Sequence, residues 1–530
     1  SHINDLRGIR MKKKPAFKPY QQHQMSFLPV NLDTLISENH IVRVVDRAIE
    51  KMNTKPLFDK YEGGGTSSYH PLMMLKVIIY AYVDKTYSCR KIAKASRENV
   101  MYMWLTGNQP LDFMTINRFR SERMKDVILD VFAEVVNLLI EEKYIKFENY
   151  FLDGTKIEAN ANKYSWVWGK NTHRYKENLK EKCRELFDRI ESINKDENTE
   201  YRSEDLEETG QGREINSEAI KKAVIEIDRR LEREPKDKEL AKVKKTIEQD
   251  YLPRMEKYEE QERILEDRKS YSKMDHDATF MRMKEDHMKN GQLKPGYNVQ
   301  MGTENQFVTG YSIHQRPGDT SCMKDHLNNV ENMLGKIPGN IIADAGYGSE
   351  ENYEYLESKQ LNGYVKYNTF HKEATKKWKS DITLVQNWEY TSDEDRYTCG
   401  YRRPLVFMWE MNQRSENKYK SRVRVYECLN CSGCPHRERC VKTDDKFANR
   451  RIYINRRLNE LKAQARDKLC SEKGLEMRSL RPIEVESVFG DIKNNFGVRR
   501  FMLKGLEKVT IEWGLYSIAH NMRKMATLMV

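Results

Sequence analysis

The chain of 530 residues carries 93 Lys and Arg against 81 Asp and Glu, a formal net charge of +12. No apolar run reaches the roughly 18 residues needed to span a bilayer, no apolar signal-peptide segment opens the chain, and nine cysteines are too few at this length for a disulfide-built protein. We therefore expect an intracellular protein of several domains, without a membrane span, whose basic surface suits a polyanionic partner.

The N-terminal part divides into an arm and a helical region. Residues 1–30 are predicted to be a flexible basic arm, either a solvated terminus or a tail that follows phosphates. Residues 31–145 repeat apolar side chains at helical spacing, and Ser88 and Asp112 stand where they can cap two short helices.

These two short helices carry a basic face. Their pattern resembles a helix-turn-helix DNA reader, whose second helix enters the major groove. The alternative is an ordinary helical bundle with a basic, solvated surface. We predict that the region binds DNA, and its candidate contacts are Arg90, Lys91, Arg118, Arg120 and Arg123.

An Asp-Gly pair in residues 146–169 has two interpretations. Asp153 follows the apolar run Tyr150 to Leu152 and precedes Gly154. Asp-Gly between apolar residues is a common signal for a two-residue hairpin turn. The alternative is a buried strand that ends at Asp153 and presents its carboxylate to a hard divalent cation.

Residues 170–269 interrupt this α/β region with a charged segment. Apolar residues recur there at helical spacing, which predicts a coiled-coil-like helical hairpin or a three-helix insert. Just before it, Trp166 and Trp168 could stack on an unpaired or flipped base, or pack against the insert.

Strand signals return in residues 270–365. They predict a hairpin with Glu304-Asn305 at its tip, then a helix over Met323 to Leu334, then a short apolar strand that runs into Asp344. Strands that neighbour each other in a mixed sheet can be far apart in sequence. Asp153 and Asp344 can therefore meet at one edge of a sheet.

Residues 366–455 form a strand-rich segment with four cysteines within thirteen positions, Cys428, Cys431, Cys434 and Cys440. Four thiolates at this spacing suit a structural zinc ion that holds together a segment with no core of its own. The short spacing also fits an iron–sulfur cluster. We favour zinc, with Cys399 and His436 as reserve ligands.

The helical residues 456–530 supply a third acid, Glu484 or Glu486. Three carboxylates can hold two divalent cations about 3.5–4 Å apart, the arrangement that activates the attacking and leaving oxygens of a phosphodiester. The alternative is that both glutamates merely face solvent.

Three blocks carry a resemblance that spans nearly the whole chain: Phe151 to Asn160, Ile342 to Tyr347 and Val485 to Lys493. The segments Tyr297 to Gln300 and Thr115 to Arg120 match as well. Together they resemble bacterial insertion-sequence transposases of the DDE class.

The resemblance implies a multidomain α+β protein. It would have a helical N-terminal DNA-binding region and a ribonuclease-H-like mixed α/β core, with a helical insert and a cysteine-containing insert. The implied catalytic acids are Asp153, Asp344 and Glu486, with Glu484 as the rival third acid. They would hold two Mg²⁺ ions, for which Mn²⁺ can substitute. Lys493, seven residues after Glu486 on the same helical face, would contact the element end.

The implied activity is binding of terminal inverted repeats, metal-dependent DNA cleavage, and transfer of the freed 3′-hydroxyl into target DNA. The implied state is a homodimer in a synaptic complex, in the bacterial cytoplasm and associated with the nucleoid. Two other functions stay open: a catalytically inactive, transposase-derived DNA-binding regulator, and a structure-specific nuclease without strand transfer.

The chain departs from its relatives at one point. They place an Arg four residues before the Glu and a Tyr three before that, where this chain has Pro482 and Ser479. Arg478 or Arg481 could take over the role of that Arg. Arg499 and Arg500 complete the candidates for contact with DNA.

Overall fold

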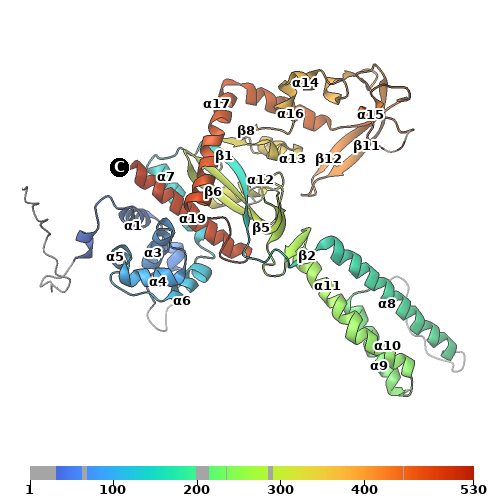
Figure 1. Ribbon diagram of the computed structural model, residues 1–530, viewed down its shortest axis with the longest axis horizontal. Helices are drawn as coiled ribbons and strands as arrows, with labels where there is room; N and C mark the ends of the chain where they lie inside the picture. The colour runs from blue at the N-terminus through green and yellow to red at the C-terminus, as the bar shows by residue number, and fades with distance from the viewer. Residues whose placement is uncertain are drawn as a thin grey trace, which may run out of the picture.

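The computed structural model describes residues 31–61, 68–198, 214–233, 235–283, 291–443, 445 and 447–529, and from 189 to 198 the backbone only. The basic arm predicted at 1–30 lies outside the described residues. The chain forms a central sheet with helices on both faces, and two inserts project from it in different directions (Figure 1). Within the described ranges, no helix is both long and apolar enough to cross a membrane.

The N-terminal part is helical, as its apolar spacing predicts. Its main helices are α1 (Ile41–Lys51), α3 (Pro71–Val83), α4 (Cys89–Glu98), α6 (Phe113–Arg118) and α7 (Ile128–Glu141). Helix α3 is buried almost all round because it packs against both α1 and the C-terminal helix α19 (Leu506–Leu528). The predicted cap of α6 is confirmed, since the Asp112 carboxylate accepts a hydrogen bond from Thr115 N at 3.0 Å.

A further short helix, α5 (Val100–Leu105), separates α4 from α6. The side chain of Asn99 caps it by accepting a hydrogen bond from Met101 N at 2.9 Å. Its six residues are all apolar, so no alternation with polar residues marks a helix in the sequence. The basic region therefore contains three short helices instead of the two that the sequence predicts.

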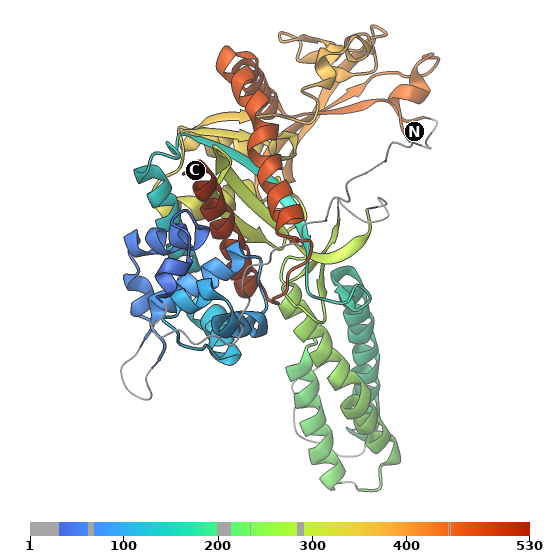
Figure 2. The ribbon, with the colours of Figure 1, turned by 60° about the vertical axis from the view of Figure 1, so that its left-hand side comes forward.

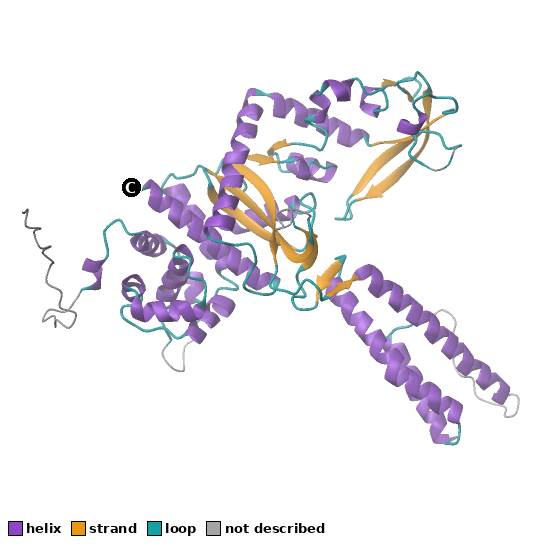
Figure 3. Ribbon diagram, in the orientation of Figure 1, coloured by secondary structure: helices purple, strands orange, loops and turns teal. Residues whose placement is uncertain are grey.

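Six strands form the central mixed sheet, in the order β4-β5-β1-β7-β8, with β6 also paired to β5 (Figure 3). Strand β1 is antiparallel to β5 and parallel to β7, and β7 is parallel to β8. Their bounds are Asn149–Glu158 (β1), Thr279–Arg282 (β4), Leu293–Glu304 (β5), Phe307–His314 (β6), Asn340–Ala343 (β7) and Asn362–Val365 (β8).

Strand β1 shows that the hairpin interpretation of Asp153-Gly154 is wrong. The strand runs through both residues, and Asp153 pairs with Met301 of β5. Gly154 does not form a turn. Position 154 requires glycine because the Gln300 side chain packs against its backbone, and a Cβ there would lie 2.3 Å from Gln300 Nε2. The strand interpretation is right, although Asp153 lies inside the strand and not at its end.

The hairpin and the helix predicted after β4 are both confirmed, as β5–β6 and α12 (Met323–Leu334). The turn is Asn305-Gln306, with φ of 52° and 60°, one residue later than the predicted tip. Both positive φ values are those of a tight hairpin turn whose twist matches the strands.

Helices cover both faces of the sheet. On one face the Tyr150 hydroxyl of β1 lies 2.7 Å from His326 Nε2 of α12. On the other face, Tyr311 of β6 packs edge-on against Phe132 of α7, with ring centroids 5.0 Å apart. A Cβ at Gly514 of α19 would lie 2.3 Å from the Tyr311 hydroxyl, so this glycine lets α19 approach the sheet closely.

The first insert is a long helical rod that projects from the sheet (Figure 2). It contains α8 (Gly169–Asn198), α9 (Ser217–Arg233), α10 (Lys238–Thr246) and α11 (Leu252–Leu265), and the short strands β2 (Trp166–Trp168) and β3 (Ser270–Ser272) pair at its base. The rod has an apolar core of its own, which includes Leu179, Ile220, Ile227 and Met255. In the described residues α10, the π-helical turn η3 (Ile247–Tyr251) and α11 continue without a break, so the rod consists of three helical stretches and confirms the predicted three-helix insert.

The second insert is an antiparallel sheet in the order β13-β12-β11-β10-β9. Its strands are β9 (Glu389–Thr391), β10 (Arg396–Thr398), β11 (Pro404–Arg414), β12 (Lys420–Cys428) and β13 (Arg451–Ile454). Helix α16 (Arg456–Cys470) then leads back to the central sheet, where it packs against β8.

One helical segment crosses the central sheet beside β1 and β7. It consists of α17 (Glu472–Arg481), the π-helical turn η7 (Pro482–Glu486), α18 (Ser487–Gly490) and a second π-helical turn, η8 (Asp491–Asn495). Helix α17 packs against β7 and β8, and η7 packs against β1 and β5. This segment carries every predicted residue of the third sequence block.

Candidate active site

Three neighbouring parallel strands bring three charged residues to one level of the sheet. The last residue pairs are Leu152 with Ala343 and Ala343 with Val365. The next positions on β1, β7 and β8 are therefore Asp153, Asp344 and Lys366. The sequence predicts that the two aspartates meet, and the register places them on adjacent strands. Lys366 was not predicted, although its place directly after an apolar strand is the same signal that identifies Asp344.

Arg481 links the two aspartates. Its Nη2 atom lies 3.1 Å from Asp153 Oδ2 and 3.7 Å from Asp344 Oδ2. Arg481 is only 8% exposed, so its charge is compensated inside the protein. The sequence analysis counts Arg481 among the DNA contacts, whereas in the structure it belongs to the carboxylate pair.

Backbone amides orient both carboxylates. Asp344 Oδ1 accepts a hydrogen bond from Gly346 N at 2.8 Å, and Asp153 Oδ1 accepts one from Gly154 N at 2.8 Å. The Oδ2 atom of each aspartate points to Arg481. In each aspartate, Oδ1 is thus oriented by a backbone amide, and Oδ2 lies against the guanidinium of Arg481.

The two candidate third acids differ in environment. Glu484 is 8% exposed, and its carboxylate accepts a hydrogen bond from Gln306 N at 2.7 Å. Burial raises the pKa of Glu484. Through its hydrogen bond to Gln306 N, the Glu484 carboxylate stabilises the turn between β5 and β6. Glu486 is exposed and follows Arg481 by five residues, one repeat of a π-helical turn. Glu484 thus stabilises the fold, whereas the exposed side chain of Glu486 remains the better candidate for the third catalytic acid.

The aspartate pair fits a divalent cation. Two carboxylates whose Oδ2 oxygens share one cationic partner offer the charge and the oxygen ligands that Mg²⁺ requires. Within the described ranges, no three Asp, Glu, His or Cys side chains already surround one point as ligands. Glu486 therefore does not join Asp153 and Asp344 around one point, and the group that lies against both aspartates is the guanidinium of Arg481.

Further basic groups surround Asp344. Burial and the nearby guanidinium groups of Arg481 and Arg478 lower the pKa of Lys366. Arg478 is held by a hydrogen bond from its Nη1 to Leu469 O at 3.0 Å and lies over the ring of Phe370. A cluster of fixed cations next to carboxylates suits a polyanion that must approach bound metal.

Asp319 is a polar neighbour of the site that the sequence does not reveal. Its Oδ1 accepts hydrogen bonds from Asn298 Nδ2 at 2.8 Å and Gln300 Nε2 at 2.9 Å. A Cβ at Gly154 would lie 2.4 Å from Asp319 Oδ1, and one at Gly346 would lie 4.0 Å from Oδ2. The Asp319 carboxylate therefore lies close to both Gly154 and Gly346.

Tyr347 connects this network to the aspartates. Its hydroxyl donates a hydrogen bond to Gln300 Oε1. Burial, and then the carboxylates of Asp319, Asp153 and Asp344, raise the pKa of Tyr347. The ring thus anchors the turn that follows Asp344.

The predicted DNA contacts have different surroundings. Arg120 is 6% exposed and donates a hydrogen bond to Tyr87 O at 2.8 Å, so it supports the fold and is not on the surface. Arg500 is partly engaged, since its Nε and Nη2 atoms donate to Ala159 O at 3.1 Å and Ala161 O at 3.0 Å. Lys493 is half-buried in η8. The remaining candidates, Arg90, Lys91, Arg118, Arg123 and Arg499, are exposed.

The two tryptophans pack within the protein. The rings of Trp166 and Trp168 lie 4.9 Å and 6.0 Å from the ring of Phe280, centroid to centroid. Trp166 keeps 37% of its surface exposed. Of the two interpretations of these residues, packing at the base of the helical insert is the one with observed contacts.

The cysteines of the second insert line a small cavity. Cys399, Cys428, Cys431, Cys434, Cys440 and His436 all contribute to its wall, and its volume is about 30 Å³. The reserve ligands of the sequence analysis thus lie beside the four predicted ones. All nine cysteines are free thiols.

Comparisons with known proteins match two parts of the chain. Residues 398–526 match the family described as Transposase DDE domain, and residues 30–122 match Transposase domain (DUF772). The first match includes Arg481, Glu486 and all five cysteines of the cavity, while Asp153 and Asp344 lie outside both. No curated protein matches the chain. With an N-terminal transposase domain before a C-terminal DDE domain, the chain belongs to the DDE-domain transposases.

Proposed function

We propose that the protein cleaves DNA at the ends of a bacterial insertion sequence and joins the freed 3′-hydroxyl ends to target DNA. The observation that carries the proposal is the row Asp153, Asp344 and Lys366 on adjacent parallel strands, with Arg481 against both aspartates. The transposase families matched by the chain support the same reaction class.

The sheet order supports a ribonuclease-H-like core. Without the short β4, the strands lie side by side in the order β6-β5-β1-β7-β8. Numbered by their order along the chain, these five strands have the spatial order 3-2-1-4-5. The first three are antiparallel and the last two are parallel to the first. This order sets the first and fourth strands side by side and so joins the two aspartates.

Asp153 and Asp344 would hold the Mg²⁺ or Mn²⁺ that the reaction needs, and Glu486 would complete the ligands. When bound, the metal ions would activate the attacking oxygen and stabilise the leaving oxygen of the phosphodiester. Glu486 is exposed and unlike Glu484 is not tied to the β5–β6 turn. It can therefore turn toward the aspartates when DNA arrives.

The fixed cations have a role on the substrate side. The Arg481 guanidinium, which lies against both aspartates, would hold a nonbridging oxygen of the scissile phosphate when the two carboxylates bind metal instead. Lys366, one strand further, is placed to hold a second. Charged hydrogen bonds of this kind orient the phosphate for in-line attack.

The rest of the chain would serve DNA binding. Arg90, Lys91, Arg118 and Arg123 are exposed on helical segments of the N-terminal region, Lys493 lies in η8, and Arg499 follows the end of η8 by four residues. A net charge of +12 favours a polyanion. A homodimer would hold two element ends together during strand transfer.

Cleavage of the terminal inverted repeats that flank the gene tests the proposal. With Mg²⁺, the protein should nick these ends and join them to a supercoiled target plasmid. Asp153→Ala and Asp344→Ala should bind the same DNA and leave it uncut, while Asp325→Ala, an exposed acid of α12, should cut normally. Normal cleavage by either active-site variant refutes the assignment.

The same assay separates the two alternatives. A regulator derived from a transposase would bind the ends and never nick them. A nuclease without strand transfer would nick them and leave no joined products on the plasmid.

A further inference from the structure

Two separate chain segments bring cysteines to the cavity of the second insert. Cys399 lies in the turn between β10 and β11, whereas Cys431 and Cys434 lie in the loop that follows β12 and Cys440 ends the short helix α15 (Arg437–Cys440). Cys440 Sγ lies within electrostatic range of the sulfurs of Cys434, Cys399 and Cys431. The Cys399 thiol thus joins three thiols that follow it in the chain by 32 to 41 residues.

Two of these sulfurs already accept hydrogen bonds from the backbone. Arg403 N donates to Cys399 Sγ at 3.3 Å, and Arg450 N donates to Cys431 Sγ at 3.3 Å. These two contacts hold the sulfurs of Cys399 and Cys431 at the wall of the cavity. Gly433, with φ of 63°, sits between Cys431 and Cys434 and turns the chain so that both thiols can face the cavity.

Cys428 differs from the other thiols of the cavity. Its thiol donates a hydrogen bond to Asn430 O at 3.5 Å, and the residue is 2% exposed within the small apolar core of the insert. It pairs with Leu405 across the β11–β12 ladder. Cys428 is thus fixed in the strand ladder with a backbone acceptor for its thiol, while its sulfur also lies within electrostatic range of Cys431 and Cys399.

We propose that Cys399, Cys431, Cys434 and Cys440 bind one structural Zn²⁺, and that Cys428 packs beside the site without being a ligand. This revises the ligand set expected from sequence by exchanging Cys428 for Cys399. The proposal is independent of the catalytic function assigned above.

The cavity suits such an ion in size and charge. Zn–S bonds of about 2.3 Å set tetrahedral sulfurs about 3.8 Å apart, which is close to contact between neighbouring thiols. The thiols line a cavity of about 30 Å³ without yet converging on one point, so side-chain rotations complete the site. Arg403, Arg437 and Arg450 also line it, and their charges offset the excess negative charge of four thiolates on one Zn²⁺.

The insert needs a crosslink because its core is small. That core is built from few buried side chains, chiefly Trp388, Leu405, Tyr426, Ile452 and Ile454. A zinc ion would tie the β10–β11 turn to the loop after β12. Arg403 already bridges these segments, since its guanidinium donates to Asn430 O at 2.6 Å and Ser432 O at 2.9 Å.

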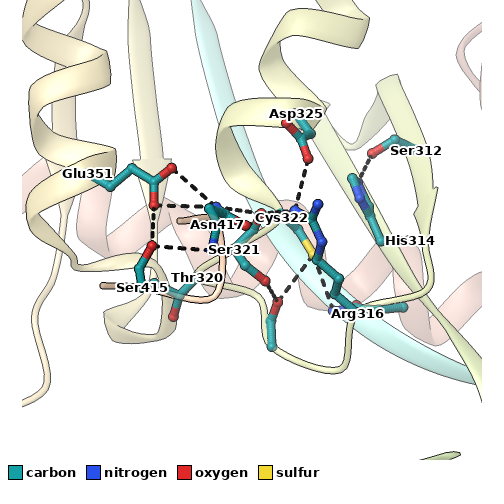
Figure 4. Close-up of polar contacts among 12 residues, drawn as sticks. Ser312, His314, Arg316, Thr320, Ser321, Cys322, Asp325, Glu351, Ser415 and Asn417 are labelled. Atoms are coloured by element: carbon teal, nitrogen blue, oxygen red, sulfur yellow. Dashed lines mark hydrogen bonds and ion pairs between the residues drawn. The ribbon is translucent and has the colours of Figure 1, made fainter. Parts of the chain in front are cut away.

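The opposite end of the same hairpin touches the central domain. At the β11–β12 tip, Asn417 accepts a hydrogen bond from Arg316 Nη1 at 2.8 Å and donates to Glu351 Oε1 at 3.2 Å (Figure 4). Arg316 is three residues before Asp319, the carboxylate beside the active site. Zinc at the base of the hairpin would therefore stiffen the strands that reach this loop.

Metal content of the full-length protein tests the ligand set. Purified wild-type protein that has been dialysed against a weak chelator should contain about one zinc ion per chain, as measured by inductively coupled plasma mass spectrometry. Cys399→Ser, Cys431→Ser, Cys434→Ser and Cys440→Ser should each lose most of it. Cys428→Ser and Cys470→Ser should keep it, Cys470 being an exposed thiol at the end of α16.

A second measurement on the wild-type protein does not depend on how well the variants fold. Replacement of zinc by Co²⁺ should give thiolate charge-transfer absorption and the visible bands of a tetrahedral site. Zinc retained by Cys399→Ser but lost by Cys428→Ser would overturn the ligand set. Wild-type protein that binds neither zinc nor Co²⁺, or that is purified with iron and sulfide, would overturn the site.

Discussion

The Arg481 guanidinium lies 3.1 Å from the carboxylate of Asp153, and the side chains of both residues are largely buried. The ion pair joins Arg481, a helix residue four positions before the third sequence block, to the strand residue Asp153 of the first block. Because Asp344 shares the same guanidinium at 3.7 Å, one cation compensates both predicted catalytic acids. Arg481 thus stands in the structure where a metal ion would serve.

Substitution of Arg481 should make stability depend on metal. Removing one partner of a buried ion pair costs about 3–5 kcal/mol, and we expect the lower end for Arg481→Met because the Asp344 side chain is 39% exposed. The Tm of the variant should therefore fall without metal and recover when Mg²⁺ is added. Arg499→Met, at an exposed position, should show neither change. A loss of Tm that Mg²⁺ leaves untouched would contradict the shared role of Arg481 and metal.

Lys366 should matter for catalysis more than for DNA binding. A charged hydrogen bond contributes about 1.5–3 kcal/mol, so Lys366→Met should slow cleavage by about 10- to 100-fold. Lys366→Arg, which keeps the charge, should recover part of the rate. The measurement is kcat and KM for nicking of end DNA. An effect confined to KM would place Lys366 in general DNA binding instead.

Asp319 should support the fold around the aspartates. Asn298 and Gln300 are fully buried, and both donate to its Oδ1 atom. Asp319→Ala removes their common acceptor and should lower the free energy of unfolding by about 1–3 kcal/mol. Asp319→Asn keeps an acceptor oxygen and should lower it less. Equal stability of the two variants in urea titrations would argue against this network.

Acid should destabilise the protein through His326, which is buried, and His314, which is half-buried. Burial lowers the pKa of His326 to about 3 and that of His314 to about 4. Unfolded histidine titrates near about 6.5, so below that pH the unfolded state binds more protons than the folded state. The free energy of unfolding should then fall from about pH 6.5 toward pH 4, by up to about 1.4 kcal/mol per pH unit for each histidine.

Chemical denaturation between about pH 7.5 and pH 4.5 measures this dependence. His326→Gln should make the dependence shallower by up to about 1.4 kcal/mol per pH unit, because glutamine does not titrate, while His314 still contributes. His173→Gln, at an exposed position of the helical insert, should leave it as in the wild type. A wild-type profile that is flat from neutral pH to pH 4.5 is incompatible with neutral His326 and His314 in the folded state.

Apolar spacing and turn residues in the sequence predicted the helices and strands whose ends are determined by neighbouring residues in the chain. Helix α12 has the predicted bounds, since apolar spacing marks its length and Gly335, at φ of 70°, ends it. The meeting of Asp153 and Asp344 was also predictable, because both follow short apolar runs that neighbouring parallel strands can bring together. Helix α5 was missed because an apolar run of six residues carries no periodic signal.

Other features depend on partners distant in sequence. Arg120 and Arg481 look like surface bases in the sequence, yet tertiary packing buries each beside acceptors from other elements. Asp319 is 166 residues from Asp153 and enters the site only through the β5 amides. Cys399 lies outside the dense cysteine cluster, and only the β10–β11 hairpin brings it to the cavity. Spacing within a sequence cannot reveal such contacts.

Mn²⁺ binding to the full-length protein, followed by electron paramagnetic resonance, tests most directly whether the aspartate pair is a metal site. The wild-type protein should bind Mn²⁺, and Mg²⁺ should displace it. Asp153→Asn and Asp344→Asn should each weaken binding by at least about tenfold, the equivalent of about 1.4 kcal/mol, while Asp325→Asn should bind as the wild type does. Wild-type affinity in both active-site variants would contradict the proposed catalytic centre.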